Sequence, residues 1–229
     1  MPDRAGRVAL VTGATGGLGP AVVEAFLAAG STVVAVGRRP PAAGQARLVS
    51  LAADLTDGQA ARDLAATVIT RYGRIDALAH VMGGFAGGRP IAETDDATWD
   101  RMLDLNARAA FHIFRAVIPH MRAAGYGRIV AVAARAAVEP AANIAAYAAS
   151  KAALVALVRA AALENKDRHI TVNAVLPGTI DTPDNRAAMP KADTGRWVQP
   201  EALADVILFL ASGAARALHG AAIPVYGTG

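Results

Sequence analysis

The sequence predicts an α/β fold: one domain in which about seven parallel strands form a doubly wound sheet with helices on both faces. Short apolar runs alternate with segments of helical spacing along the whole chain. The 229 residues suit one domain with a large core, and no repeat, linker or low-complexity stretch divides them. Apolar residues make up 54% of the chain and charged residues 18%, a balance that argues against disorder.

The predicted strands are short runs rich in Val, Ile, Leu and Ala. They are Arg7–Thr12, Thr32–Val36, Arg47–Leu51, Ala77–Met82, Arg128–Ala133, Ile170–Val175 and Ala221–Tyr226. Most of them are apolar along their whole length, without the alternation of a half-exposed strand. Such runs are typical of parallel strands, because helices cover both faces of a parallel sheet.

The predicted helices lie between these strands. They are Ala21–Ala29, Gly58–Tyr72, Thr98–Ala124, Ile144–Ala162 and Pro200–Ala211. Asp57 is placed to cap the second helix, and polar interruptions divide the third into two helices that meet near Asn106. Residues 184–196 lack a core-facing pattern, and irregular segments of this length are usually functional or mobile. We therefore expect a substrate lid around residues 184–197, with Trp197 at its apolar edge.

A glycine-rich turn, Gly13-Ala14-Thr15-Gly16-Gly17-Leu18-Gly19, joins the first strand to the first helix. Glycines allow a tight turn and close approach to a pyrophosphate, and the helix N-terminus supplies free N–H groups and a positive dipole end. Because strand, loop and helix follow in that order, the sequence favours a Rossmann-like dinucleotide-binding domain over an ordinary turn.

The second strand ends where such a domain contacts the adenosine ribose. An acid there would bind the ribose 2′-hydroxyl, but the sequence has Gly37-Arg38-Arg39. Guanidinium groups suit a phosphate, so we predict NADP(H) as cofactor, with NAD(H) still possible. Solvated loop arginines are the alternative, which is stronger for Arg39 than for Arg38. Asp54 follows the third strand, at the edge of the sheet where ligands bind.

Tyr147 and Lys151 lie four residues apart in an Ala-rich helical segment, so they share a helix face. A nearby cation favours the phenolate form. We therefore expect Lys151 to lower the pKa of Tyr147 and to make it a proton donor and acceptor near neutral pH. The pair alone would not exclude an exposed tyrosine and lysine without a role.

In order and spacing, these motifs resemble the short-chain dehydrogenase/reductase family over essentially the whole chain. The resemblance is carried by Thr12, Gly13, Gly17, Gly19, Asp54, Gly83, Asn106, Tyr147, Lys151, Pro177, Gly178, Thr182, Pro200 and Glu201. It implies an NAD(P)-dependent oxidoreductase with a single NAD(P)-binding domain over residues 1–229. In that family's pattern, Tyr147 transfers the proton, Lys151 binds the nicotinamide ribose, and Asn106 supports a water-linked proton path.

The resemblance also implies the cofactor contacts. The glycine loop would hold the pyrophosphate, Asp54 would meet the adenine, and Ile180 and Thr182 would contact the nicotinamide carboxamide. The complete set of implied cofactor positions is Gly13, Thr15, Gly16, Gly17, Leu18, Gly19, Arg38, Arg39, Asp54, Leu55, Gly83, Tyr147, Lys151, Pro177, Gly178, Ile180 and Thr182.

Two positions depart from the family pattern. Ala134 stands where the family usually has a serine that donates to the substrate oxygen, and losing such a donor costs about 10²–10³ in turnover in other enzymes. A catalytically weak or silent NADP(H)-binding sensor is therefore the alternative function. His80-Val81-Met82-Gly83 replaces the usual Asn-Asn-Ala-Gly, and we interpret His80 as a histidine packed at a strand end.

One branch of the family is similar at the same unusual places. Dihydropteridine reductases keep the Tyr–Lys pair without the serine, and they have a glycine-rich loop like Gly83–Gly88 and a segment like residues 176–197. This resemblance implies a quinonoid, pterin-like substrate, reduced at a conjugated C=N. Ordinary ketones compete with it, and that branch resembles NADH users, whereas Arg38 and Arg39 favour NADPH.

Composition limits the other function classes. The chain has no cysteine and its five histidines are scattered, so no metal site is expected. The net charge of +4 comes from scattered arginines, which suits an anionic ligand and gives no sign of nucleic-acid binding. Without a signal peptide or a membrane span, we expect a cytoplasmic protein that acts on a small molecule. Its Ala-rich helices could pair subunits into a homo-tetramer or homo-dimer.

Overall fold

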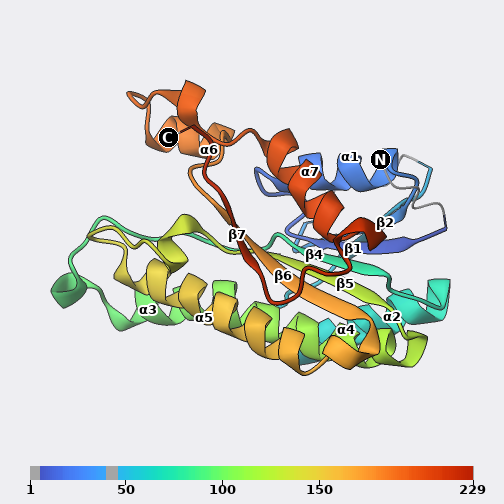
Figure 1. Cartoon of the computed structure of the whole chain (residues 1–229). Coiled ribbons are helices and arrows are strands. Elements are labelled where there is room, and N and C mark those ends of the chain that lie inside the picture. The colour runs from blue at the N-terminus through green and yellow to red at the C-terminus, as the bar shows by residue number, and fades with distance from the viewer. Residues whose placement is uncertain (1–5, 40–45, 229) are drawn as a thin grey trace.

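A computed structural model describes residues 6–39 and 46–228. They form three layers, with a parallel sheet between two layers of helices (Figure 1). Among these described residues, the sheet has seven strands in the order β3-β2-β1-β4-β5-β6-β7. The strands are β1 Val8–Thr12, β2 Thr32–Gly37, β3 Leu48–Ala52, β4 Ala77–His80, β5 Gly127–Val132, β6 Ile170–Pro177 and β7 Ala222–Val225. The predicted doubly wound parallel sheet is confirmed.

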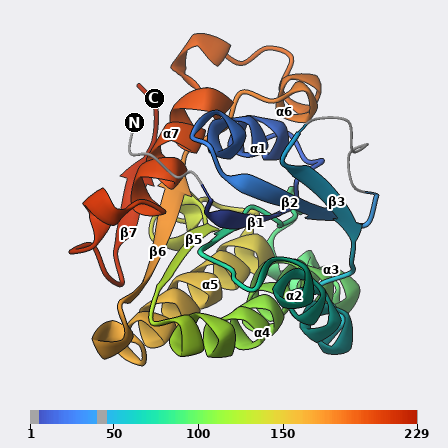
Figure 2. The same ribbon diagram turned by 90° about the vertical axis from the view of Figure 1, so that its right-hand side faces the viewer.

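The helices cover both faces of the sheet. They are α1 Gly19–Ala28, α2 Gly58–Tyr72, α3 Asp96–Leu103, α4 Ala109–Ala124, α5 Ala145–Leu163, α6 Pro183–Ala188 and α7 Pro200–Leu210. Short 3₁₀ turns occupy Ile91–Glu93, Arg135–Ala137, Lys166–Arg168, Thr194–Arg196 and Gly213–Ala215. Figure 2 shows α1 and α7 on one face and α2, α4 and α5 on the other.

Two hydrophobic cores result, one on each face of the sheet. Along β1, Val8 and Leu10 belong to the core beneath α2, α4 and α5, whereas Ala9 and Val11 belong to the core beneath α1 and α7. All five residues of β1 are buried. This two-sided burial explains why the strand is apolar throughout, since successive side chains point to opposite faces.

The chain reverses its direction of winding at β1. From β1 it moves outward to β2 and β3, and then crosses back to β4 on the other side of β1. In the register, Thr12 at the end of β1 pairs with Val36 of β2 and His80 of β4. A crevice at the carboxyl ends of the strands lies at such a switch point, where open α/β sheets bind ligands.

Most predicted element bounds differ from the structure by one or two residues, but residues 184–196 are a correction. The sequence indicated an irregular segment, whereas Pro183–Ala188 forms α6. The Thr182 hydroxyl accepts from the Asn185 N–H at 3.3 Å, and Pro183 occupies the first helical position. A threonine cap followed by proline starts a helix even without a core-facing pattern.

The predicted pair of helices in residues 98–124 is continuous in the structure. A π-helical turn, Asp104–Arg108, joins α3 to α4 without a break. Such turns interrupt α-helices frequently at functional sites, because they rotate one side chain away from the regular spacing. Here the buried residue of the turn is Asn106.

Helix α5 is the one described helix whose length and composition would allow it to cross a membrane. Half of its most apolar window is buried inside the protein, and its buried residues include Lys151. A core helix passes the same test, and the contacts of α5 with β6 and α3 mark it as such a helix.

Gly73 should contribute about 1 kcal/mol to the free energy of unfolding, relative to alanine. Gly73 ends α2 with φ of +70°, where an added Cβ would meet nothing within 4 Å. Gly73→Ala should therefore lower the free energy of unfolding by about 1 kcal/mol through backbone strain alone. Gly213→Ala is the matched control, because Gly213 also has open space but no positive φ. Urea unfolding of both variants measures this, and equal effects would contradict it.

Candidate functional site

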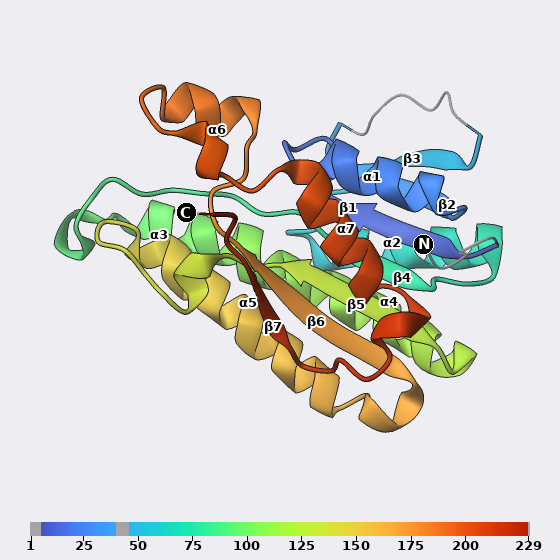
Figure 3. The same ribbon diagram turned by 45° about the horizontal axis from the view of Figure 1, so that its top comes forward.

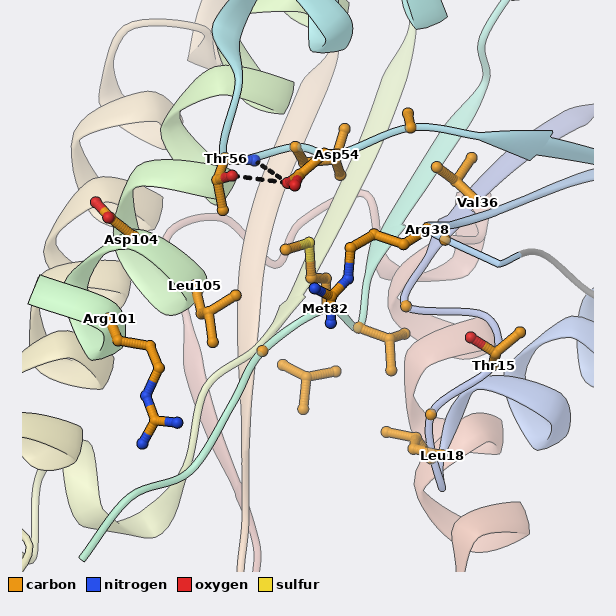
Figure 4. Close-up of a pocket in the computed structure, with 18 of the residues that line it drawn as sticks. Thr15, Leu18, Val36, Arg38, Asp54, Thr56, Met82, Arg101, Asp104 and Leu105 are labelled. Carbon is orange, nitrogen blue, oxygen red and sulfur yellow. Dashed lines mark hydrogen bonds between the residues drawn. The ribbon is translucent and has the colours of Figure 1, made fainter. Parts of the chain in front are cut away.

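A cleft of about 710 Å³ opens at the carboxyl ends of β1, β2 and β4. The glycine loop forms one wall, and residues of α3 and the π turn form the wall opposite (Figure 4). Ten of the predicted cofactor positions line it: Gly13, Thr15, Gly16, Gly17, Leu18, Arg38, Asp54, Leu55, Gly83 and Ile180. The switch point of the sheet therefore gathers residues that lie far apart in the sequence.

The glycine loop packs too closely for side chains. A Cβ on Gly13 would lie 2.6 Å from the Met82 nitrogen, and one on Gly19 would lie 2.4 Å from the Gly13 carbonyl oxygen. No described residue accepts a hydrogen bond from the backbone N–H groups of Thr15, Gly17 or Leu18. Free N–H groups at the start of a helix form a cradle for an anion, and the pyrophosphate of a dinucleotide fits it.

Arg38 and Asp54 lie together at one end of the cleft (Figure 4). The Asp54 carboxylate accepts from the Thr56 hydroxyl at 2.7 Å and from the Thr56 N–H at 3.0 Å. These two hydrogen bonds lower the pKa of Asp54, and the charge of Arg38 contributes less. Arg39 is exposed and is absent from the cleft wall, so the two arginines are not equivalent.

Lys151 is almost completely buried, with 4% of its surface exposed. Its Nζ donates to the Val132 carbonyl at 2.9 Å, and burial lowers its pKa to about 8. It lies directly behind Gly83 of the cleft wall, because a Cβ on Gly83 would come within 2.9 Å of Nζ. The ammonium group therefore reaches the floor of the cleft from α5.

The expected effect of Lys151 on Tyr147 is wrong for this structure. Burial raises the pKa of Tyr147 to about 12 instead of lowering it. Tyr147 is half-buried and Lys151 is buried on α5, and the Lys151 ammonium is directed to the Val132 carbonyl. Burial removes water from the charged phenolate, and this loss of solvation is the cause of the raised pKa of Tyr147. The Phe85 ring packs edge-on against Tyr147, with centroids 4.9 Å apart.

Asn106 ties the cleft loop to helix α5. Its amide accepts from the Gly84 N–H and donates to the Gly84 carbonyl, both at 3.0 Å, and it donates to the Ser150 hydroxyl at 3.0 Å. Ser150 in turn donates to the Tyr147 carbonyl at 2.7 Å. Sequence reasoning gave Ser150 no role, although its position three residues after Tyr147 places it within reach of that carbonyl.

The remaining predicted positions do not line this cleft. They are Gly19, Arg39, Asn106, Tyr147, Lys151, Pro177, Gly178 and Thr182. Thr182 packs against the glycine loop, since a Cβ on Gly17 would lie 2.6 Å from its methyl group. Gly178 instead packs against the C-terminal strand, where its N–H donates to Val225.

Residues 184–197 stand beside α7 as a separate projection (Figure 3). Both ends are fixed: Ile180 and Val198 form a parallel β-bridge, and the Asp181 carboxylate binds Arg186 and Gln199. The hydrogen bonds from Arg186 and Gln199 lower the pKa of Asp181 to about 2. The segment predicted as a lid therefore begins shortly after the cleft residue Ile180 and ends just before Val198, the partner of Ile180 in the bridge.

The two unusual positions are both buried. His80 Nδ1 lies 2.9 Å from the Thr12 hydroxyl, as expected of a packed histidine, while no described residue partners its Nε2. Burial, helped by the charge of Lys151, lowers the pKa of His80 to about 3, so this side chain is neutral. Ala134 is 6% exposed and offers no donor. Within residues 6–39 and 46–228, no three His, Cys, Asp or Glu side chains group to hold a metal.

The fold and the cleft define a dinucleotide-binding α/β protein. Residues 7–193 match the model of the short chain dehydrogenase family, and the chain belongs to the short-chain dehydrogenases/reductases. The resemblance carried by the motifs is thereby confirmed.

Similar proteins cover nearly the whole chain. The cis-4-hydroxycyclohexanecarboxylate dehydrogenase of Sinomonas cyclohexanicum is 34% identical, over 96% of this chain and 95% of its own. The 3-oxoacyl-[acyl-carrier-protein] reductase of Thermotoga maritima is 30% identical, over 97% of both. A short-chain type dehydrogenase/reductase from Mycobacterium ulcerans superposes with a TM-score of 0.93 and 27% identity, over 99% of this chain and 90% of its own. These relatives are oxidoreductases, which disfavours the sensor alternative.

Burial of Lys151 should appear as a pH-dependent stability. Its pKa is about 8 in the fold against an ordinary 10.5, so above pH 8 the unfolded chain binds more protons than the folded one. The free energy of unfolding should therefore rise by about 2 kcal/mol between pH 8 and 10 relative to Lys151→Met. Tyr147 interferes only above that window, because its raised pKa removes stability above its ordinary value of 10.0. Parallel curves for the two proteins would contradict the burial of a charged Lys151.

Proposed function

We propose that the protein is an NADP(H)-dependent oxidoreductase that transfers hydride between nicotinamide and a small carbonyl/alcohol or conjugated C=N substrate. The proposal rests on one observation: the glycine loop and the residues next to Lys151 and Asn106 adjoin the same cleft. A glycine cradle with free N–H groups lies at one wall, and Gly83 connects that cleft to Lys151 and Asn106. One bound dinucleotide could thus reach both the cradle and the Tyr147 region.

Nicotinamide supplies the hydride when it is bound, and the protein supplies position and a proton. With a pKa of about 12, Tyr147 keeps its proton at neutral pH and is a general acid for the reductive direction. Lys151, with a pKa of about 8, is a cation at neutral pH. Approach of that cation to the phenol oxygen would favour proton release from Tyr147 in the assembled site.

Two substrate classes remain within this proposal. Ala134 leaves Tyr147 without the usual second donor, which suits a substrate whose charge is spread over a ring, such as a quinonoid pterin. Phe85 is 66% exposed beside Tyr147 and offers an apolar surface to a flat ring. Two of the named relatives favour alcohols and ketones instead, since one is a hydroxycyclohexanecarboxylate dehydrogenase and the other a 3-oxoacyl-[acyl-carrier-protein] reductase.

Three further features belong to the proposal. Residues 184–197 would cover the substrate, because both ends of the segment are fixed beside Ile180. Phe111 of α4 and Leu163 of α5 are exposed apolar side chains that would be buried in a homo-dimer or homo-tetramer. We also propose a cytoplasmic location.

Removing the Tyr147 hydroxyl tests the chemistry. Tyr147→Phe should lower turnover by about 10² or more, because it removes the general acid, while NADPH affinity stays unchanged. The assay is NADPH oxidation with quinonoid dihydropterin and, separately, with cyclic ketones. A Tyr147→Phe variant that keeps its turnover would overturn the role of Tyr147. Tight NADPH binding by the wild type without turnover on either substrate would favour the sensor.

Reversing the charge at Arg38 tests the cofactor preference. Arg38→Asp should weaken NADPH binding by about tenfold or more and should favour NADH, because an acid there binds a ribose hydroxyl and repels a 2′-phosphate. Arg39→Asp is the matched control, with the same charge change one residue away and off the cleft wall. Dissociation constants from cofactor fluorescence decide it. If both variants shift the NADPH/NADH ratio equally, the 2′-phosphate argument at Arg38 fails.

A further inference from the structure

Arg101 is a cleft-lining cation to which the sequence pattern assigns no role. It comes from α3, in the wall that faces the glycine loop. Among the described residues that line the cleft, Arg38 and Arg101 carry positive charge. In Figure 4, Arg38 lies beside Asp54, whereas Arg101 extends from the opposite wall at the level of Leu18. The two arginines therefore lie in different parts of the cleft.

Among the described residues, none holds the Arg101 guanidinium by a hydrogen bond or ion pair. The guanidinium donates no hydrogen bond to the described residues, although Asp100 and Asp104 line the same wall. Asp104, in the same wall, is bound by Arg108 at 2.6 Å instead. The hydrogen bonds from Thr98 are the main cause of the lowered pKa of Asp95, to which Arg89 and Arg101 add only their charge.

The placement of the other donors indicates what Arg101 faces. The free N–H groups of Thr15, Gly17 and Leu18 form one wall of the cleft, and Arg101 is the cation of the wall opposite. A group that is bound by the N–H cradle presents its outer oxygens away from it, toward α3. Guanidinium binds phosphate oxygens with a fork of two N–H donors.

We propose that Arg101 binds the diphosphate bridge of the dinucleotide from the wall opposite the glycine loop. This rests on the proposed dinucleotide function and extends it with a contact outside the glycine motif. The diphosphate is then held from two sides, by backbone N–H groups on one and by a side chain on the other. Arg38 serves the adenosine end, so the two arginines separate cofactor selection from cofactor affinity.

Three ligands distinguish the possible contacts of Arg101. NADPH and NADH both carry the diphosphate, whereas adenosine 2′-monophosphate carries only the phosphate that Arg38 would recognise. Dissociation constants are measured for the wild type, Arg101→Gln and Arg89→Gln, by cofactor fluorescence and by competition. Arg89→Gln is the matched control, because Arg89 is an exposed arginine whose charge also acts on Asp95 but which does not line the cleft.

Arg101→Gln should weaken NADPH and NADH binding alike, by about tenfold at low salt, because a charge-assisted contact is lost. Adenosine 2′-monophosphate binding should not change, and Arg89→Gln should behave as the wild type. Unchanged dinucleotide binding in Arg101→Gln overturns this contact alone. Weakening confined to NADPH and adenosine 2′-monophosphate reassigns Arg101 to the 2′-phosphate and overturns it as well. A wild type that binds no dinucleotide overturns the proposed function itself.

Discussion

The parallel pairing of β1 with both β2 and β4 is the constraint on which the rest of the site depends. It aligns Thr12 with Val36 and His80, so three strands end together and their loops diverge from one edge. The glycine loop and Arg38 follow β1 and β2 directly, and Gly83 comes three residues after the end of β4. A register shift of one residue would move the side chains of β1 to the opposite core, because Val8 and Leu10 pack on one face of the sheet and Ala9 and Val11 on the other. The sheet therefore fixes the walls of the cleft before any side chain contributes.

The residues behind the cleft lower the stability of the fold mainly because polar groups are buried there. Lys151 and Asn106 are both withdrawn from solvent, and each is held by backbone groups: Val132 for the ammonium and Gly84 for the amide. Burial raises the pKa of Tyr147 and lowers the pKa of Lys151, so that it favours the neutral form of both side chains. The two hydrophobic cores, one on each face of the sheet, offset the free energy that the burial of these polar groups costs. Shifted pKa values of this kind are typical of sites in which side chains exchange protons.

The sequence predicted the sheet, its parallel strands and ten residues of the cleft wall, because these depend on local patterns: apolar runs, glycine spacing and residues at strand ends. It could not predict α6, because the start of that helix depends on one threonine cap and one proline. It also missed the direction of the Tyr147 pKa shift. A four-residue spacing reports which residues share a face, whereas solvation depends on what Phe85 and the neighbouring elements cover. Arg101 was missed for the same reason, since only the folded chain brings α3 opposite the glycine loop.

The bridge between Ile180 and Val198 separates the sequence of the loop between them from the geometry of the sheet edge. It closes residues 181–197 into a loop whose two ends are held together, with Asp181 bound to Arg186 and Gln199 at the base. Substitutions or insertions within the loop then leave the paired ends, and with them the cleft wall at Ile180, in register. On the proposal that this loop covers the substrate, a lineage could exchange one small molecule for another by altering the loop alone, while the proposed nucleotide cradle stays unchanged.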